Sequence, residues 1–291
     1  MTDNLRLGAW NALAAAAAFA LAGACVKAAT ADTGITLVVF FRNATGLVLL
    51  LPWLLRKGTG ALATQRLTGH LWRSGLGVCA MYCFFFSLSR LQLAEAMVLT
   101  YSAPLFIPFL AWWAVGEPPS PILLPALALG LVGVLLIAKP DAHGLMTSAA
   151  AVGLLSGVFA AGAMVTIRRI SSTEPAVRIV FYFALLSTVL TALPLPWTWR
   201  TPDAAALGWM LATGVLATGG QLFLTRAYTL APAARVGAFT YAAVVFSGAI
   251  GWIAWAEQPD RLSLLGMALV IACCLLAATR PTAVVRPTGA G

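Results

Sequence analysis

Ten apolar runs, each about as long as a helix that crosses a membrane, restrict what this chain can fold into. The runs are 8–29, 35–55, 70–89, 93–115, 121–138, 148–166, 177–197, 204–228, 233–255 and 262–279. Hydrophobic residues make up 61% of the chain and charged residues 9%, against roughly 25% charged in a soluble domain. Lipid offers no partner to an exposed backbone N–H or C=O, and the runs are longer than the ~10 residues of a barrel strand. The sequence therefore predicts an all-α membrane protein with ten transmembrane helices.

The chain also repeats itself at a separation of 140 residues. The matched positions are Tyr101 with Tyr241, Trp112 with Trp252, and Glu117 with Glu257. Chance does not account for these matches, because the whole chain holds only five Tyr and ten Trp. We predict two five-helix repeats, 1–140 and 141–291, within one integral membrane unit. Since each repeat crosses an odd number of times, the second is inverted, as in secondary transporters that bind substrate near the midplane and work by alternating access.

The positive residues predict the orientation. With a cytoplasmic N-terminus, twelve Lys and Arg, Arg73 among them, fall in cytoplasmic segments, five fall in outer segments, and Arg42 lies inside a span. The positive-inside rule then places both termini in the cytoplasm. The net charge of +9 is explained by this asymmetry and by contact with anionic lipid headgroups. We expect the lipid bilayer, and no nucleic acid, as a partner.

Polar residues deep in the spans are candidates for a substrate cavity, because a polar group in hydrocarbon needs a partner or water. They are Tyr82, Thr100, Tyr101, Gln221, Thr240 and Tyr241. Hydrogen bonds between neighbouring helices are the alternative for each of them. No Asp or Glu lies at the centre of a span, and Arg42 is the one charge placed deep in a span. The cavity is therefore expected to suit neutral or zwitterionic solutes.

Two further groups suggest how access to such a cavity would change. The candidates for an outer gate are the charged residues Lys27, Arg42 and Glu95. The alternative for the two cations is that they extend to the membrane surface. The candidates for a hinge are Pro104, Pro108 and Gly248, the last of which matches Pro108 in the repeat. Proline removes a backbone hydrogen bond and glycine loosens a helix, although a static kink is the alternative.

The residues needed for an enzyme or a metal site are missing. The two histidines, His70 and His143, lie at the start of a span and in a loop, and all five cysteines lie in apolar runs. Cys79 and Cys83 are spaced i, i+4 but have no further ligand nearby. We predict no catalytic residue, no metal ligand and no cofactor. A channel is disfavoured because rings of polar residues and filter loops are absent from the sequence. The number of subunits is left open.

These features together form a recognisable pattern. Lys27 comes late in the first span, Arg42 comes early in the second, and an acidic residue followed closely by Pro ends the fourth and ninth spans, as Glu117-Pro118 and Glu257-Gln258-Pro259. The chain resembles the EamA family of the drug/metabolite transporter superfamily, and in particular its exporters of amino acids, aromatic ones included. The resemblance implies a carrier of the bacterial inner membrane whose central cavity is lined by the first, third and fourth spans and by the sixth, eighth and ninth.

We therefore expect a small-molecule exporter, with neutral or aromatic amino acids as its substrates. The alternative is an uptake carrier for a vitamin, a carboxylate or a nucleotide-like metabolite.

Overall fold

The computed structural model describes residues 4–29, 34–88, 90, 99–118, 121–138, 148–256 and 259–278, and all regular elements within them are helices. They are α1 (Leu5–Ala29), α2 (Ile35–Lys57), η1 (Thr59–Leu62), α3 (Leu67–Leu88), α5 (Ala103–Val115), α6 (Leu123–Ala138), α8 (Ser148–Ile170), α9 (Ala176–Ala192), α10 (Leu195–Thr198), α11 (Ala204–Leu230), α12 (Ala233–Thr240), α13 (Ala242–Trp255) and α14 (Arg261–Ala278). Six helical segments are long and apolar enough to cross a membrane, and α5, α6 and α9 are shorter apolar helices.

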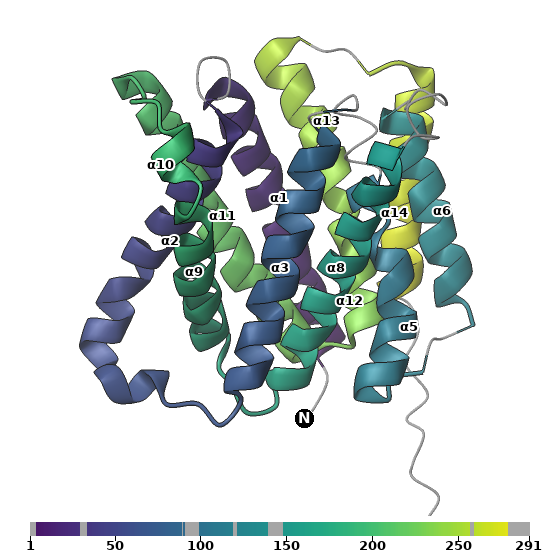
Figure 1. The fold of residues 1–291 in the computed structure, drawn as a ribbon. Coiled ribbons are helices and arrows are strands. Elements are labelled where there is room, and N and C mark those ends of the chain that lie inside the picture. The colour runs from purple at the N-terminus through teal and green to yellow at the C-terminus, as the bar shows by residue number, and fades with distance from the viewer. Residues whose placement is uncertain are drawn as a thin grey trace, which may run out of the picture.

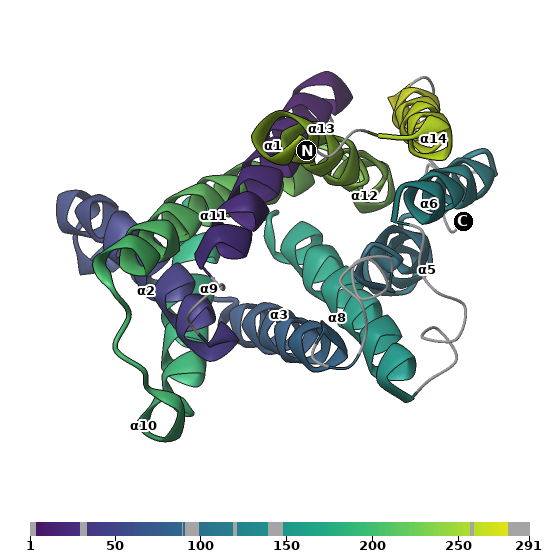
Figure 2. The same ribbon diagram turned by 90° about the horizontal axis from the view of Figure 1, so that it is seen from above.

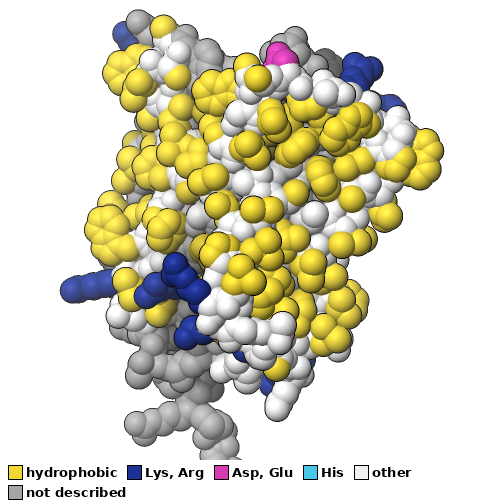
Figure 3. Space-filling model, turned by 90° about the vertical axis from the view of Figure 1, so that its left-hand side faces the viewer, with side chains coloured by type: hydrophobic (Ala, Val, Ile, Leu, Met, Phe, Trp, Pro, Cys, Tyr) yellow, Lys and Arg dark blue, Asp and Glu magenta, His cyan; other side chains and the backbone are white. Residues whose placement is uncertain are grey.

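The long helices run side by side as one bundle (Figure 1). Hydrophobic side chains cover most of the face shown in Figure 3, while Lys and Arg gather near its upper and lower parts. This distribution is typical of a surface that faces lipid. The predicted all-α membrane fold is confirmed, and each of the ten predicted spans contains a described helix.

The packing of the helices follows the duplication of the sequence. Helix α1 lies against α11, and α3 lies against α8 (Figure 2). The shift of 140 residues carries α1 onto α8 and α3 onto α11, so these two contacts are the same contact with the halves exchanged. In the same way α2 packs against its own counterpart α9, and α6 packs against its counterpart α14. The bundle is therefore built from two inverted repeats whose helices interleave.

Both repeats are interrupted at the matched tyrosines. The ninth span breaks between α12 and α13 at Tyr241, and the fourth span turns at Tyr101 and Ser102 just before α5. The backbone tightens to i, i+3 hydrogen bonds there, from Leu105 N–H to the Ser102 carbonyl (2.9 Å) and from Val244 N–H to the Tyr241 carbonyl (3.0 Å). The two halves thus share an interrupted helix at the same level.

The hinge candidates lie next to these interruptions or beyond them. Pro104 is in the first turn of α5, whereas Pro108 is inside α5 and buried. Gly248 lies inside the continuous α13. At the ends of α5 and α13 the chain again takes matching conformations, because Gly116 (φ 74°) and Ala256 (φ 55°) are both left-handed.

Polar contacts join the two halves at the end of the bundle where the N-terminus lies (Figure 1). Glu117, just after α5, accepts hydrogen bonds from Arg168 Nε (2.7 Å) and from Ala233 N–H (3.0 Å). Both donors belong to the second repeat, at the end of α8 and the start of α12. This ion pair therefore joins the two repeats at that end of the bundle.

A second contact at this end holds the connection between α2 and α3. Arg178 of α9 donates from Nε to the Ala61 carbonyl (2.7 Å), and the Tyr182 hydroxyl donates to the Leu62 carbonyl (2.8 Å). His70 stacks on the Tyr182 ring, with their centroids 4.3 Å apart. The short helix η1 is thereby fixed on the second repeat.

Candidate functional site

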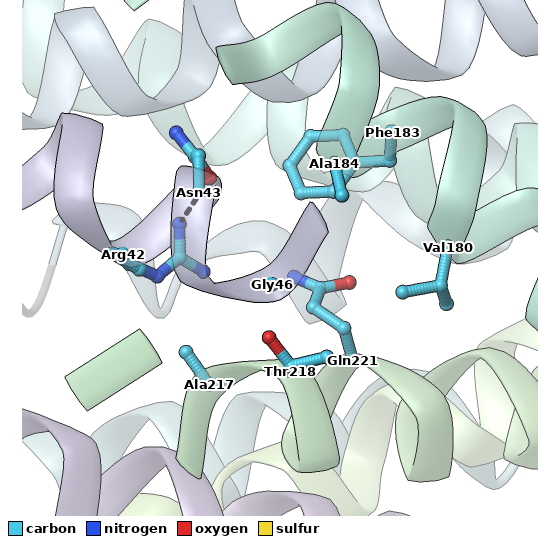
Figure 4. A pocket seen from close by; sticks show the side chains of 9 residues that line it. All are labelled: Arg42, Asn43, Gly46, Val180, Phe183, Ala184, Ala217, Thr218 and Gln221. Carbon is cyan, nitrogen blue, oxygen red and sulfur yellow. Dashed lines mark hydrogen bonds between the residues drawn. The ribbon is translucent and has the colours of Figure 1, made fainter. Parts of the chain in front are cut away.

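A polar pocket lies where α2 of the first repeat meets α9 and α11 of the second (Figure 4). It is lined by Arg42, Asn43, Gly46, Val180, Phe183, Ala184, Ala217, Thr218 and Gln221. Its open volume is about 20 Å³, which is room for about one water molecule. The pocket is therefore small. It lies between the repeats, where secondary transporters hold their substrates, but of the six spans that the family resemblance implies for the cavity it includes the eighth alone.

Arg42 is the charged residue that lines this pocket. Its Nη1 lies 3.5 Å from Asn43 Oδ1 and 3.3 Å from Met81 Sδ. The first distance is at the limit of a hydrogen bond, and a thioether is a weak acceptor. Asn43 is buried, and its Nδ2 has no hydrogen-bond partner. Figure 4 shows this nitrogen on the side away from Arg42, so the donor that the α2 wall presents, and that the described residues leave largely unmatched, is the Arg42 guanidinium.

A second guanidinium stands directly behind the pocket. Arg73 of α3 is only 4% exposed. Its Nη2 donates to Gln221 Oε1 (2.9 Å), and its guanidinium carbon lies 3.9 Å from the centroid of the Phe183 ring. Gln221 and Phe183 both line the pocket, so Arg73 supports two of its walls.

The burial of Arg73 corrects its assignment to the cytoplasmic positive residues. It lies inside the helix α3, on a face that packs toward α9 and α11. Arg42 is therefore not the one charge deep in the bundle. The sequence signal for the burial of Arg73 was its position inside the apolar run 70–89.

The contact with Arg73 fixes the orientation of the Gln221 amide. A guanidinium has only donors, so the amide oxygen must face Arg73 and the NH₂ group must face away from it. Figure 4 shows the Gln221 nitrogen on the side that faces Arg42. The nearby Thr218 hydroxyl donates within its own helix, to the Gly214 carbonyl (2.6 Å).

The structure brings Arg42 and Gln221, two of the predicted site residues, together in this pocket. Tyr82 lies on α3 and is 44% exposed. Thr100 shares a hydrogen bond with Ser156 of α8 (2.8 Å).

The remaining cavity candidates lie on or beside the interrupted helices. Tyr101 packs near Ala16 of α1 and near Ala242 at the start of α13. Thr240 donates to the Gly237 carbonyl (2.7 Å). Tyr241 is fully buried, and a Cβ added at Gly130 would come within 2.7 Å of its ring. The two matched tyrosines thus lie outside the pocket in this conformation, and their role as cavity residues stays a prediction.

Two of the three gate candidates fall wholly or partly outside the described residues. Glu95 is not among them, and of Lys27 the structure describes the backbone, in α1. Arg42, the third, lines the pocket. The outer gate therefore stays a prediction.

A family model described as the EamA-like transporter family matches residues 6–139 and 147–279. The chain belongs to this family. The two matches account for the two halves of the bundle, and they make the protein a multi-pass membrane transporter.

Relatives within this family differ in what they carry. A pseudopaline exporter of Pseudomonas aeruginosa is 36% identical over 275 residues, which cover 94% of this chain and 96% of the relative. A riboflavin transporter of Rhizobium johnstonii is 27% identical over 236 residues, which cover 81% of this chain and 78% of the relative.

A solved crystal structure has the same fold. It matches with a TM-score of 0.79 and 19% sequence identity, covering 94% of this chain and 96% of the other. At this identity the match supports the fold alone.

Proposed function

We propose that this EamA-family transporter is an inner-membrane exporter of amino acids and related small metabolites. The substrate binds in the pocket between α2, α9 and α11, and both termini lie in the cytoplasm. The observation that carries the proposal is the pocket itself, because it lies between the two repeats and presents the Arg42 guanidinium and the Gln221 amide NH₂. The similarity to a pseudopaline exporter over 94% of the chain supports the direction of transport.

Export by this protein requires two closures. The pair of Glu117 with Arg168 closes the bundle at the end that bears the N-terminus. When that contact opens, substrate enters from the cytoplasm and the small pocket widens around it. When the contact re-forms, the halves separate at the other end and release the substrate. The interruptions at Tyr101 and Tyr241 give each half a place to bend.

The test is efflux from cells or liposomes that contain the wild-type protein or the variant Arg42→Gln. Cells are loaded with each of the radiolabelled amino acids, and the rate of release is followed. We expect Arg42→Gln to lower the rate by about tenfold or more, because a charge-assisted hydrogen bond to substrate contributes about 1.5–3 kcal/mol. The matched control is Arg200→Gln, since Arg200 is exposed and lies before α11.

Two results contradict the proposal. Unchanged efflux in Arg42→Gln removes the pocket from the transport path. Release of no amino acid by wild-type protein removes the class of substrate.

Uptake of a vitamin is the second candidate function, and the riboflavin transporter relative favours it. Cells that express the protein decide between the two functions. Riboflavin accumulation against its gradient in cells that express the chain, without amino-acid efflux, supports uptake.

The preference for neutral or aromatic amino acids is not part of this proposal. The expectation of neutral solutes rested on Arg42 as the one deep charge, and Arg73 is also buried next to the pocket. The expectation of aromatic amino acids rested on the family resemblance and stays a prediction.

A further inference from the structure

The donors turned to the pocket are a guanidinium and an amide NH₂ group. Arg42 has no acceptor atom, and Gln221 directs its NH₂ group away from Arg73 and toward Arg42. The side-chain acceptors in the lining are Asn43 Oδ1, which faces Arg42, and the Thr218 oxygen, whose hydroxyl donates to the Gly214 carbonyl. A ligand that matches these groups must itself be rich in acceptors, as a carboxylate is.

The charge at the pocket leads to the same conclusion. Arg42 and Arg73 place two positive charges in the bundle, and an unbalanced charge in a low-dielectric interior is costly. Among the described residues the carboxylates have partners elsewhere. Glu117 binds Arg168, Glu174 binds Arg178, and Asp203 and Asp260 accept from backbone N–H groups at the starts of α11 and α14.

We propose that the substrate of this pocket carries at least one more carboxylate than ammonium groups, and that Arg73 selects for it by holding the Gln221 amide with its NH₂ group toward the substrate. This inference rests on the proposed function, because it assumes that the pocket binds the transported molecule. Arg73 is a positioning residue here, since it acts through Gln221 and Phe183.

If Arg73 has this role, its removal should abolish or reverse the preference for an acid over its amide. Without the guanidinium, the Gln221 amide is free to turn over and present its oxygen to the pocket. An amide oxygen accepts hydrogen bonds from an ammonium or a carboxamide and repels a carboxylate. Loss of Arg73 therefore changes the preference between an acid and its amide, whereas a defect in folding weakens both alike.

The experiment measures binding to the purified full-length protein in detergent, by thermal-shift titration. The probes are three matched pairs: L-glutamate with L-glutamine, L-aspartate with L-asparagine, and succinate with succinamate. In wild-type protein we expect one acid or more to bind at least tenfold tighter than its amide. In Arg73→Gln this ratio should fall to about one or reverse, while Arg73→Lys, which still donates to Gln221, should keep most of it.

A second variant leaves Arg73 in place. Gln221→Glu pairs with Arg73 and puts a negative charge beside the pocket, so it should also lose the preference for acids. Arg200→Gln is the control for both variants and should keep the wild-type ratio.

The inference is overturned if no acid in wild-type protein binds tighter than its amide, or if Arg73→Gln weakens both members of a pair equally. A different result would overturn the proposed function. Efflux of neutral amino acids without a preference for acids overturns the inference alone, and tight binding of acids without efflux overturns the exporter alone.

Discussion

The ion pair at the N-terminal end of the bundle gives a direct test of how the two halves are held together. In the variant Glu117→Ala, Arg168 loses its carboxylate partner and the Ala233 N–H loses its acceptor. Ala233 begins α12, and Pro232 before it has no side-chain hydrogen bond to offer as a cap. Glu117 therefore caps a helix of the other repeat as well as binding a cation, and both roles favour a carboxylate there.

The expected loss of stability follows from the burial of the pair. The side chains of Arg168 and Glu117 are only 10% and 20% exposed, so solvent screens their contact much less than that of a surface pair. Two hydrogen bonds to a charged group at about 1.5–3 kcal/mol each, discounted for the water that reaches Glu117, give about 2–4 kcal/mol. At roughly 2–3 °C per kcal/mol for a chain of this size, the Tm should fall by about 4–12 °C.

The assay is thermal unfolding of purified protein in detergent, followed by tryptophan fluorescence. Glu117→Gln is the matched control, because a carboxamide oxygen still accepts from Ala233 N–H, and it should lose less than Glu117→Ala. A double-mutant cycle with Arg168→Ala isolates the pair, and we expect a coupling of about 1 kcal/mol or more. A Tm within about 1 °C of wild type for Glu117→Ala, or no coupling in the cycle, would refute the reasoning.

Two further predictions concern other contacts between helices. The side chain of Glu174 is 2% exposed. Burial alone raises the pKa of Glu174, but hydrogen bonds from Thr64 and Arg178 and the charges of Arg178 and His70 lower it by more. The pKa therefore lies below its ordinary value of 4.5. The stability that this group contributes is present above pH 4.5 and is lost as the pH falls through the lower folded pKa. Between pH 6 and pH 3 the Tm should therefore fall less steeply in Glu174→Gln than in wild type. Equal slopes would contradict this. A Cβ at Gly133 of α6 would lie 2.6 Å from the Gly266 carbonyl of α14, so Gly133→Ala should cost about 1–3 kcal/mol. The control Gly208→Ala, in α11 with nothing within 4 Å of the added Cβ, should gain up to about 1 kcal/mol, and equal Tm values for the two variants would count against the close contact.

The fold could be predicted from the sequence because its signals are repeated along the whole chain. Apolar runs of membrane length leave only helices, and the matched Tyr, Trp and Glu residues give the duplication and hence the inversion. The interruption at the matched tyrosines was less visible. Pro104 accounts for it in the first half, whereas Val244 takes the same place in the second and is unremarkable as a residue.

The site was less predictable because it depends on which helix faces meet. Gln221 and Arg42 were both candidates, but nothing in the sequence brings α2 and α11 to one pocket. Arg73 was assigned to the cytoplasmic positive residues, since an Arg near the start of an apolar run is typical of a membrane boundary. Its burial depends on acceptors from other helices, Gln221 and the Phe183 ring, and such contacts cannot be seen along one chain.

The pocket also shows how an asymmetric site arises on a symmetric fold. The duplication matches Arg42 with Tyr182 and Met81 with Gln221, so corresponding backbone positions carry unlike side chains. Tyr182 binds the Leu62 carbonyl near the N-terminal end, while Arg42 lines the pocket. The inverted repeat gives the two halves matching backbones, whereas both cations at the pocket, Arg42 and Arg73, belong to the first half. If the pocket binds the substrate, the same Arg42 wall is met from either side, while contacts such as Glu117 with Arg168 differ between the two ends.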